Sequence, residues 1–226
     1  MCGCPKNISY LCRNAKQRSP LLSTLLHINY NGLRVVVAGM AGGEVLPPQA
    51  FCSAQEREEY AQLGSSKRQH ERAATLHLLH RLLGVHAPLH HHANGSPYLA
   101  GGGLHISISH AQHAVGIALH PTRKVGIDVE STQRNFARVA ARFLSRDEQR
   151  YLLTQAQRCL AWCAKEAVYK AVGEQGVDFA VQILLEPIEE KSEGEVLARF
   201  IGKGGERSIL LRYHLMGSTA VAYAVA

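Results

Sequence analysis

The sequence predicts an α+β protein made of two similar lobes. The first half combines a strand signal, two helical stretches and further strands, and the second half places helices before a run of antiparallel strands. A chain of 226 residues with 46% hydrophobic content can bury a sizeable core. We expect a loose N-terminal extension over residues 1–20, an N-terminal lobe over 21–120 and a C-terminal lobe over 121–226.

Turn and capping signals place the elements of the first lobe. Asn31-Gly32 is a turn signal ahead of a β-branched run, and Ser53 with Glu56 forms a capping box that opens a helix. A second helix stops at Gly84, since glycine commonly follows a helix C-terminus. The expected elements are a strand over 33–38, a helix toward 63, a helix over 67–83, a turn and strand over 94–99, and a hairpin of strands 104–109 and 114–119.

The second lobe is predicted to contain helices followed by a meander of strands. Ser145 and Glu148 form another capping box, so a short helix begins there and runs toward Leu153. A longer helix ends near Gly173. The expected strands cover residues 125–130, 179–185, 196–201, 208–214 and 219–225.

An acidic pair lies on the first of these strands. Valine and isoleucine alternate there with Gly126, Asp128 and Glu130, so the period of two sends both carboxylates to one side. Two like charges side by side need a cation, and carboxylate oxygens suit Mg²⁺ or Mn²⁺. A solvated strand end is the plain alternative, and the pair alone does not decide between them.

The helix that ends near Gly173 carries a second polar group. Trp162, Glu166 and Lys170 stand at i, i+4 and i+8 and share one face, with Lys165 about 100° away. An ordinary surface salt bridge would explain Glu166 and Lys170 by themselves. The acidic strand upstream is the reason to treat both elements as one site.

Together these elements resemble the signature of the 4′-phosphopantetheinyl transferases. The chain has V-G-I-D-V-E at 125–130 and W-C-A-K-E-A-V-Y-K-A at 162–171, in the order and at the spacing of that family. It also has the family's apolar run ending in Ser109-His110 and its N-G-x-P-Y-L segment at 94–99. The resemblance covers about residues 50–185.

The resemblance implies two lobes related by a pseudo-twofold axis, with the site in the cleft between them. It implies an enzyme that moves the 4′-phosphopantetheine arm of coenzyme A onto a serine of an acyl or peptidyl carrier protein. Asp128, Glu130 and Glu166 would hold Mg²⁺, with Mn²⁺ as the alternative, and the role of Glu166 as base or only as ligand stays open. Lys170 and His110 would stabilise the phosphates.

Further coenzyme contacts are implied in the same way. Ser109, Lys165 and the basic start of the second helix would face the phosphates, and Trp162 would pack the signature helix against the core. The basic residues of that helix are Lys67, Arg68 and Arg72. A solvated basic face is the alternative for these three residues.

The chain also departs from the resembled family at three places. Many relatives have lysine at the position of Ser96, arginine near Leu76 or His77, and a second serine at the position of Ala111. Two coenzyme contacts of the family are therefore expected to be absent.

Charge and cysteine content indicate the partners and the compartment. The formal net charge of +7 predicts an anionic partner, and the carriers of the resembled family are acidic near their serine. We expect no nucleic acid and no membrane partner, since no apolar run approaches a membrane span, and we expect a monomer. Six scattered cysteines fit free thiols and the cytoplasm, and the histidines at 90–92 fit a loop with adventitious metal affinity.

Two other functions stay open from the sequence. A metal-dependent nuclease is also basic and carries acids with a lysine, but that lysine usually lies two residues from the carboxylate on a strand. Glu166 and Lys170 are four apart on a helix. A non-catalytic relative would bind the carrier protein without coenzyme, although the retained carboxylates argue against it.

Overall fold

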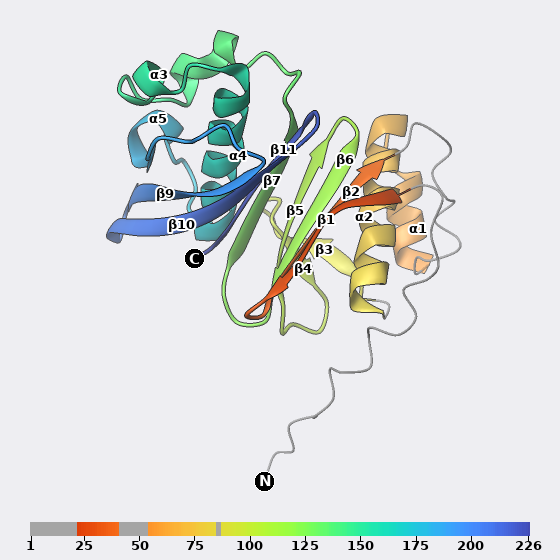
Figure 1. Cartoon of the computed structure of the whole chain (residues 1–226). Coiled ribbons are helices and arrows are strands. Elements are labelled where there is room, and N and C mark those ends of the chain that lie inside the picture. The colour runs from red at the N-terminus through yellow and green to blue at the C-terminus, as the bar shows by residue number, and fades with distance from the viewer. Residues whose placement is uncertain (1–21, 41–53, 85–86) are drawn as a thin grey trace.

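The computed structural model describes residues 22–40, 54–84 and 87–226, so the extension expected over 1–20 lies outside the described part. Figure 1 shows two large antiparallel sheets, each with a long helix against one face, and the described residues also form a small two-stranded sheet. The elements are β1 (Leu22–Tyr30), β2 (Leu33–Met40), α1 (Ala54–Ala61), α2 (Ser66–Leu83), β3 (Leu89–His91), β4 (Pro97–Leu99), β5 (His105–Ala111), β6 (Ala114–His120), β7 (Val125–Ser131), the 3₁₀ helix η2 (Ala137–Arg142), α3 (Glu148–Tyr151), α4 (Gln155–Val172), α5 (Phe179–Gln182), β8 (Ile183–Leu185), β9 (Glu193–Gly202), β10 (Gly205–Met216) and β11 (Thr219–Val225).

The first sheet has the strand order β1-β2-β6-β5, and α2 packs against it. Ser65 caps the start of α2 by accepting a hydrogen bond from the Arg68 amide, and Gly84 ends the helix in the left-handed conformation at φ 66°. Leu78 and Leu79 of α2 join Ile117 of β6 in the apolar core of this sheet. The expected helix and hairpin are therefore present.

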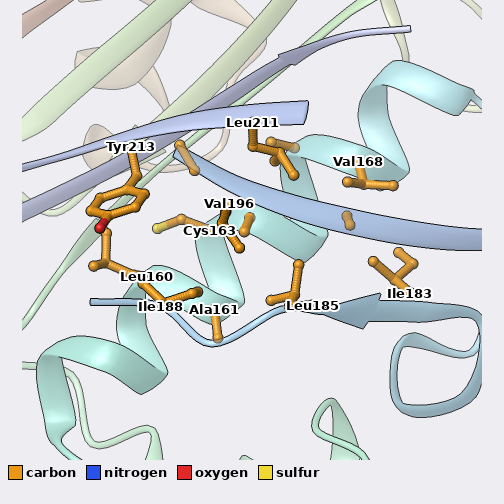
Figure 2. Packing of buried hydrophobic residues seen from close by; sticks show 14 of the residues in the cluster. Leu160, Ala161, Cys163, Val168, Ile183, Leu185, Ile188, Val196, Leu211 and Tyr213 are labelled. Atoms are coloured by element: carbon orange, nitrogen blue, oxygen red, sulfur yellow. The ribbon is translucent and has the colours of Figure 1, made fainter. Parts of the chain in front are cut away.

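The second sheet has the strand order β7-β11-β10-β9-β8, and α4 covers one of its faces. Thr154 and Gln157 form a capping box at the start of α4, and Gly173 ends it at φ 68°. Figure 2 shows Leu160 and Val168 of this helix among apolar side chains of β8, β9 and β10. The helix that carries the predicted signature is thus fixed along its length.

Close packing brings α4 directly onto β7. A Cβ atom at Gly126 would lie 1.8 Å from the carbonyl oxygen of Ala167, so only glycine permits this approach of helix backbone to strand. The neighbouring residues of β7 that share the face of Gly126 are Asp128 and Glu130. The contact therefore sets the acidic pair against the helix.

The two sheets meet at β7, which is an edge strand of the second sheet. Its buried amide groups at Ile127 and Val129 have no strand partner on that side. The hydroxyl groups of Ser107 and Ser109 on β5 accept hydrogen bonds from them at 3.1 Å each. A third apolar cluster, with Val35, Val37, Ile127, Val129 and Val221 among its members, continues this junction through both sheets.

The mixed α+β class is confirmed, and two expectations need correction. The strand predicted over 179–185 begins only at Ile183, because Asp178 caps the amide of Ala180 and the chain first forms the short helix α5. The helix at Ser145 has the expected reciprocal bonds with Glu148, yet it ends at Tyr151, one turn after it begins. The pseudo-twofold relation and the lobe boundaries stay predictions.

Strand β1 was not expected from the sequence. Most of its residues are exposed, and it pairs with β2 at the edge of the first sheet. An exposed edge strand has little need of alternating apolar residues, so it leaves little pattern in the sequence.

Within the described ranges, no helix is both long and apolar enough to cross a membrane.

Candidate active site at the junction of the two sheets

The polar faces of β7 and α4 meet as their sequence periods predict. The Lys170 ammonium of α4 donates hydrogen bonds to Asp128 Oδ1 at 2.7 Å and to the carbonyl oxygen of Ile127 at 3.0 Å. Glu166 lies one turn earlier on the same face of α4. The structure therefore brings Asp128, Glu130, Glu166 and Lys170 to one place from segments about forty residues apart.

The carboxylates in this group are crowded and poorly hydrated. Burial, and next the negative charge of Asp128, raise the pKa of Glu166, while Lys170 opposes the shift. Burial also raises the pKa of Glu130, with Arg134 opposing and Asp128 adding to the change. Both shifts mean that the negative charges lack enough solvation or positive charge, which an added cation would supply.

Asp128 is a buried acid of the group and makes hydrogen bonds to two side chains. It is 5% exposed, and Ser109 Oγ and Lys170 Nζ both donate to its Oδ1 atom at 2.7 Å. Its other oxygen, Oδ2, is buried and has no hydrogen-bond partner. Because a buried carboxylate oxygen is costly to leave unpaired, this atom is suited to bind a cation.

The donors present fit a hard divalent cation. They are carboxylate oxygens, which Mg²⁺ and Mn²⁺ prefer, and one of them is the unpaired Oδ2 of Asp128. Among the described residues, however, no three His, Cys, Asp or Glu side chains form a ready-made metal site. Instead, Lys170 forms an ion pair with Asp128, and Arg134 forms one with Glu130. The three-carboxylate site with Glu166 stays a prediction that needs side chains to move.

Removal of the Ser109 hydroxyl is expected to weaken both fold and cation binding. Ser109→Ala leaves the Val129 amide without its acceptor and Asp128 without one donor, so the free energy of unfolding should fall by about 1–3 kcal/mol. Affinity for Mn²⁺ should fall about tenfold, as for loss of a group that orients a metal ligand.

The matched control is Ser107→Ala, which removes the same kind of bond from the Ile127 amide but does not touch Asp128. Chemical denaturation and Mn²⁺ titration measure the two effects. Equal Mn²⁺ affinity in the two variants would contradict an orienting role for Ser109.

His110 lies at the end of β5, next to Ser109. Thr75 of α2 donates its hydroxyl hydrogen to the carbonyl oxygen of Glu71 at 2.8 Å, so it accepts from His110 Nε2 at 2.6 Å. This pairing assigns the hydrogen of the neutral ring to Nε2. Burial lowers the pKa of His110, with Lys170 adding to the shift. Donation to a phosphate from Nδ1 would therefore require protonation of the ring.

The basic residues of α2 have protein partners of their own. Arg72 is mostly buried and contacts Glu59 at 3.2 Å and the carbonyl oxygen of Leu89 at 3.1 Å. Lys67 is 79% exposed and lies 3.8 Å from Glu71, and Arg68 is exposed near the cap of the helix. Their coenzyme contacts stay predictions, and only Lys67 and Arg68 have side chains open to solvent.

Lys165 lies away from the acidic group. Its side chain is fully buried in the second core, where the ammonium donates to Glu148 at 2.7 Å and to the carbonyl oxygen of Phe179 at 2.9 Å. Burial lowers its pKa to about 8, and Glu148 opposes that shift. The expected phosphate contact is thus replaced by an internal ion pair, since the 100° turn from Glu166 points Lys165 into the core.

A cavity of about 540 Å³ opens beside Lys170. It runs between the N-G-x-P-Y-L segment and β5 on one side and the end of α4 on the other. Lys124, Ser107 and Tyr169 also line it. Ser96, which stands where relatives have lysine, lies in its wall and donates to Asn94 at 2.7 Å. Leu76, at the other departure, is a core residue.

Sequence reasoning missed several residues of this region, above all Arg134, Thr75 and Lys124. Arg134 pairs with Glu130, Thr75 holds His110, and Lys124 lines the cavity. No periodic pattern marks any of them. They lie in a loop, on the far helix and at a strand start, and tertiary packing alone brings them to the site.

The comparisons with known proteins agree with this part of the structure. The model of the 4′-phosphopantetheinyl transferase superfamily matches residues 124–226, which include β7 and α4. No curated protein matches the chain. Residues 124–226, with the acidic strand and the helix that meets it, therefore form a domain of the 4′-phosphopantetheinyl transferase superfamily.

Proposed function

We propose that this protein transfers the 4′-phosphopantetheine group of coenzyme A to a serine hydroxyl of an acyl or peptidyl carrier protein. The released product is adenosine 3′,5′-bisphosphate. The observation that carries the proposal is Asp128, held by Lys170 and Ser109 with one buried oxygen unpaired, inside the segment that the superfamily matches. Catalysts of phosphoryl transfer use a cation beside the phosphates, and this oxygen is a suitable ligand for one.

Three carboxylates would hold the cation, and Asp128 is the ligand among them that hydrogen bonds already hold in place. Mg²⁺, or Mn²⁺ in its place, would neutralise charge on the diphosphate when bound. Glu130 and Glu166 complete the proposed donor set, since Glu130 shares the face of β7 with Asp128 and Glu166 shares the face of α4 with Lys170. Lys170 is 27% exposed and adjoins the cavity, so its remaining hydrogen can reach a phosphate oxygen.

Glu166 is the group best suited to take the proton of the serine hydroxyl. Its side chain has no hydrogen-bond or ion-pair partner among the described residues, so one carboxylate oxygen can bind the cation while the other accepts the proton. Burial raises its pKa, which favours a role as base, whereas a bound cation would oppose that shift. His110 is the weaker candidate, because its Nε2 is held by Thr75.

The cavity beside Lys170 supports a seat for the coenzyme. Its volume of about 540 Å³ lies within the usual range of ligand sites. Lys124 and Lys170 add positive charge to its wall, and Tyr98 and Tyr169 add aromatic surface. A phosphorylated, partly apolar ligand fits such a lining.

An acidic carrier protein fits the charge of the chain. The net charge of +7 would speed its approach, so the transfer rate should fall as salt is raised.

Cys159 and Cys163 are buried free thiols, which supports a reducing compartment such as the cytoplasm. We propose a monomer, since both sheets that meet at the site belong to one chain.

The test is to incubate the protein with coenzyme A, Mg²⁺ and an apo carrier protein and to weigh the carrier by mass spectrometry. Gain of the phosphopantetheine mass supports the proposal. Stable binding of the carrier with no mass gain would instead support the non-catalytic relative. Cleavage of added nucleic acid with no mass gain would support the nuclease.

A further inference from the structure

Arg134 lies at the acidic group although no sequence pattern marks it. It follows β7 in a turn closed by its amide on the Ser131 carbonyl oxygen at 3.1 Å. Gln155, the first residue of α4, donates its side-chain amide to the Arg134 carbonyl oxygen. The loop that carries Arg134 is thus tied to both elements of the site.

The side chain of Arg134 is aimed at the carboxylates by aromatic rings. Its guanidinium carbon lies 5.0 Å from the ring centre of Phe136 and 5.3 Å from that of Trp162. From this position the guanidinium forms an ion pair with Glu130. Trp162 therefore positions a cation as well as packing α4, which the sequence did not indicate.

Every acid that the metal site requires is thereby near a positive side chain. Lys170 pairs with Asp128, Arg134 pairs with Glu130, and the charges of both act on Glu166. The unpaired Oδ2 of Asp128 is the place where a further cation can enter. An ion that also binds Glu130 must compete with Arg134 there.

Of the two pairs, the one with Arg134 is easier to break. The Arg134 side chain is 49% exposed, whereas Lys170 is 27% exposed and its partner Asp128 is buried. The side chain of Glu130 is 17% exposed and that of Asp128 8%, so water screens the pair of Arg134 and Glu130 more than the pair of Lys170 and Asp128.

We propose that Arg134 is an internal counter-cation, which occupies Glu130 in the free protein, yields it to the divalent cation, and so sets the affinity for that cation. The inference rests on the proposed function only for the identity of the ion site. Under this inference Arg134 lowers the affinity for the cation, whereas Ser109 is expected to raise it.

The experiment measures Mn²⁺ binding to the full chain without coenzyme, by the electron paramagnetic resonance signal of free Mn²⁺. Arg134→Gln should bind Mn²⁺ about fivefold to tenfold tighter than wild type, since one positive charge leaves the site. Arg134→Lys keeps the charge without the planar stacking and should fall between them.

Two controls define the site. Arg150→Gln changes an arginine that is 79% exposed and pairs with exposed Asp147, so its Mn²⁺ affinity should equal that of wild type. Asp128→Asn should remove the tight binding that the other variants share. Thermal unfolding checks that each variant is folded.

An unchanged or weaker Mn²⁺ affinity in Arg134→Gln overturns the inference, as does Mn²⁺ binding that Asp128→Asn leaves intact. The carrier assay separates this failure from failure of the proposed function. If the wild type modifies the carrier and the Arg134 variants bind Mn²⁺ as wild type does, only the inference is refuted. Tighter Mn²⁺ binding in Arg134→Gln, with no transfer by any form, refutes only the function.

Discussion

Asp128→Asn is expected to lower kcat/KM for phosphopantetheinyl transfer at least about a hundredfold. Loss of a group that merely orients a metal ligand costs ten- to a hundredfold, and Asp128 is itself the expected ligand. Asparagine would offer one neutral oxygen in place of two charged ones. It would also leave Lys170 without its carboxylate partner.

The control for this variant is Asp147→Asn, which makes the same substitution at a side chain that is 83% exposed. Its transfer rate should match that of wild type. Mass spectrometry of the carrier gives the rates, and Mn²⁺ titration shows whether the lost activity follows lost cation binding. An Asp128→Asn enzyme that keeps its activity would remove Asp128 from the chemistry and with it the proposed site.

The main parts of the site were predictable because they lie on regular elements. A strand period of two and a helix period of four place Asp128, Glu130, Glu166 and Lys170 on facing sides, and the glycine at 126 lets those sides meet. Their types and spacing were enough to indicate the family that matches residues 124–226. The local period of a strand or helix is therefore enough to place these four residues.

Residues whose partners are distant could not be placed in this way. The sequence gives Arg134 no periodic relation to Trp162, and it gives Lys165 no link to Glu148, seventeen residues earlier. The phosphate contact expected of Ser109 stays a prediction, and its hydrogen bonds with Asp128 and with the Val129 amide of β7 were not expected. Which neighbour a polar side chain meets depends on how the sheets and helices pack.

Among the helices and strands, too, some were predictable from local pattern and others were not. Helices with caps and strands with apolar alternation were expected at nearly the observed positions, as for α2, α4 and β9 to β11. The exposed edge strand β1 and the single turn α5 were not expected. Solvent exposure weakens the hydrophobic pattern of β1, and one side-chain cap from Asp178 is enough to turn an apparent strand into α5.

Lys165→Met is expected to lower the free energy of unfolding by about 3–5 kcal/mol. The variant leaves the Glu148 carboxylate buried beside the amides of Ser145 and Leu185 with no cation. It also deprives the carbonyl oxygen of Phe179 of its donor. A buried charge without a partner is far more costly than an absent pair.

Two further variants separate this burial effect from the removal of any lysine. Lys191→Met changes a lysine that is 64% exposed and paired with Glu189, so its unfolding free energy should match that of wild type. The double variant Glu148→Gln with Lys165→Met removes both charges and should recover most of the lost stability. Urea denaturation measures all three.

The same variant decides whether Lys165 has a part in transfer. An internal ion pair predicts that folded Lys165→Met, assayed well below its melting temperature, keeps a kcat close to that of wild type. A phosphate contact predicts the reverse, a large fall in kcat with little change in unfolding free energy. Because Lys165 is fully buried and donates to Glu148 and to a backbone carbonyl oxygen, its ammonium has no path to a ligand in the cavity, and we expect the first result.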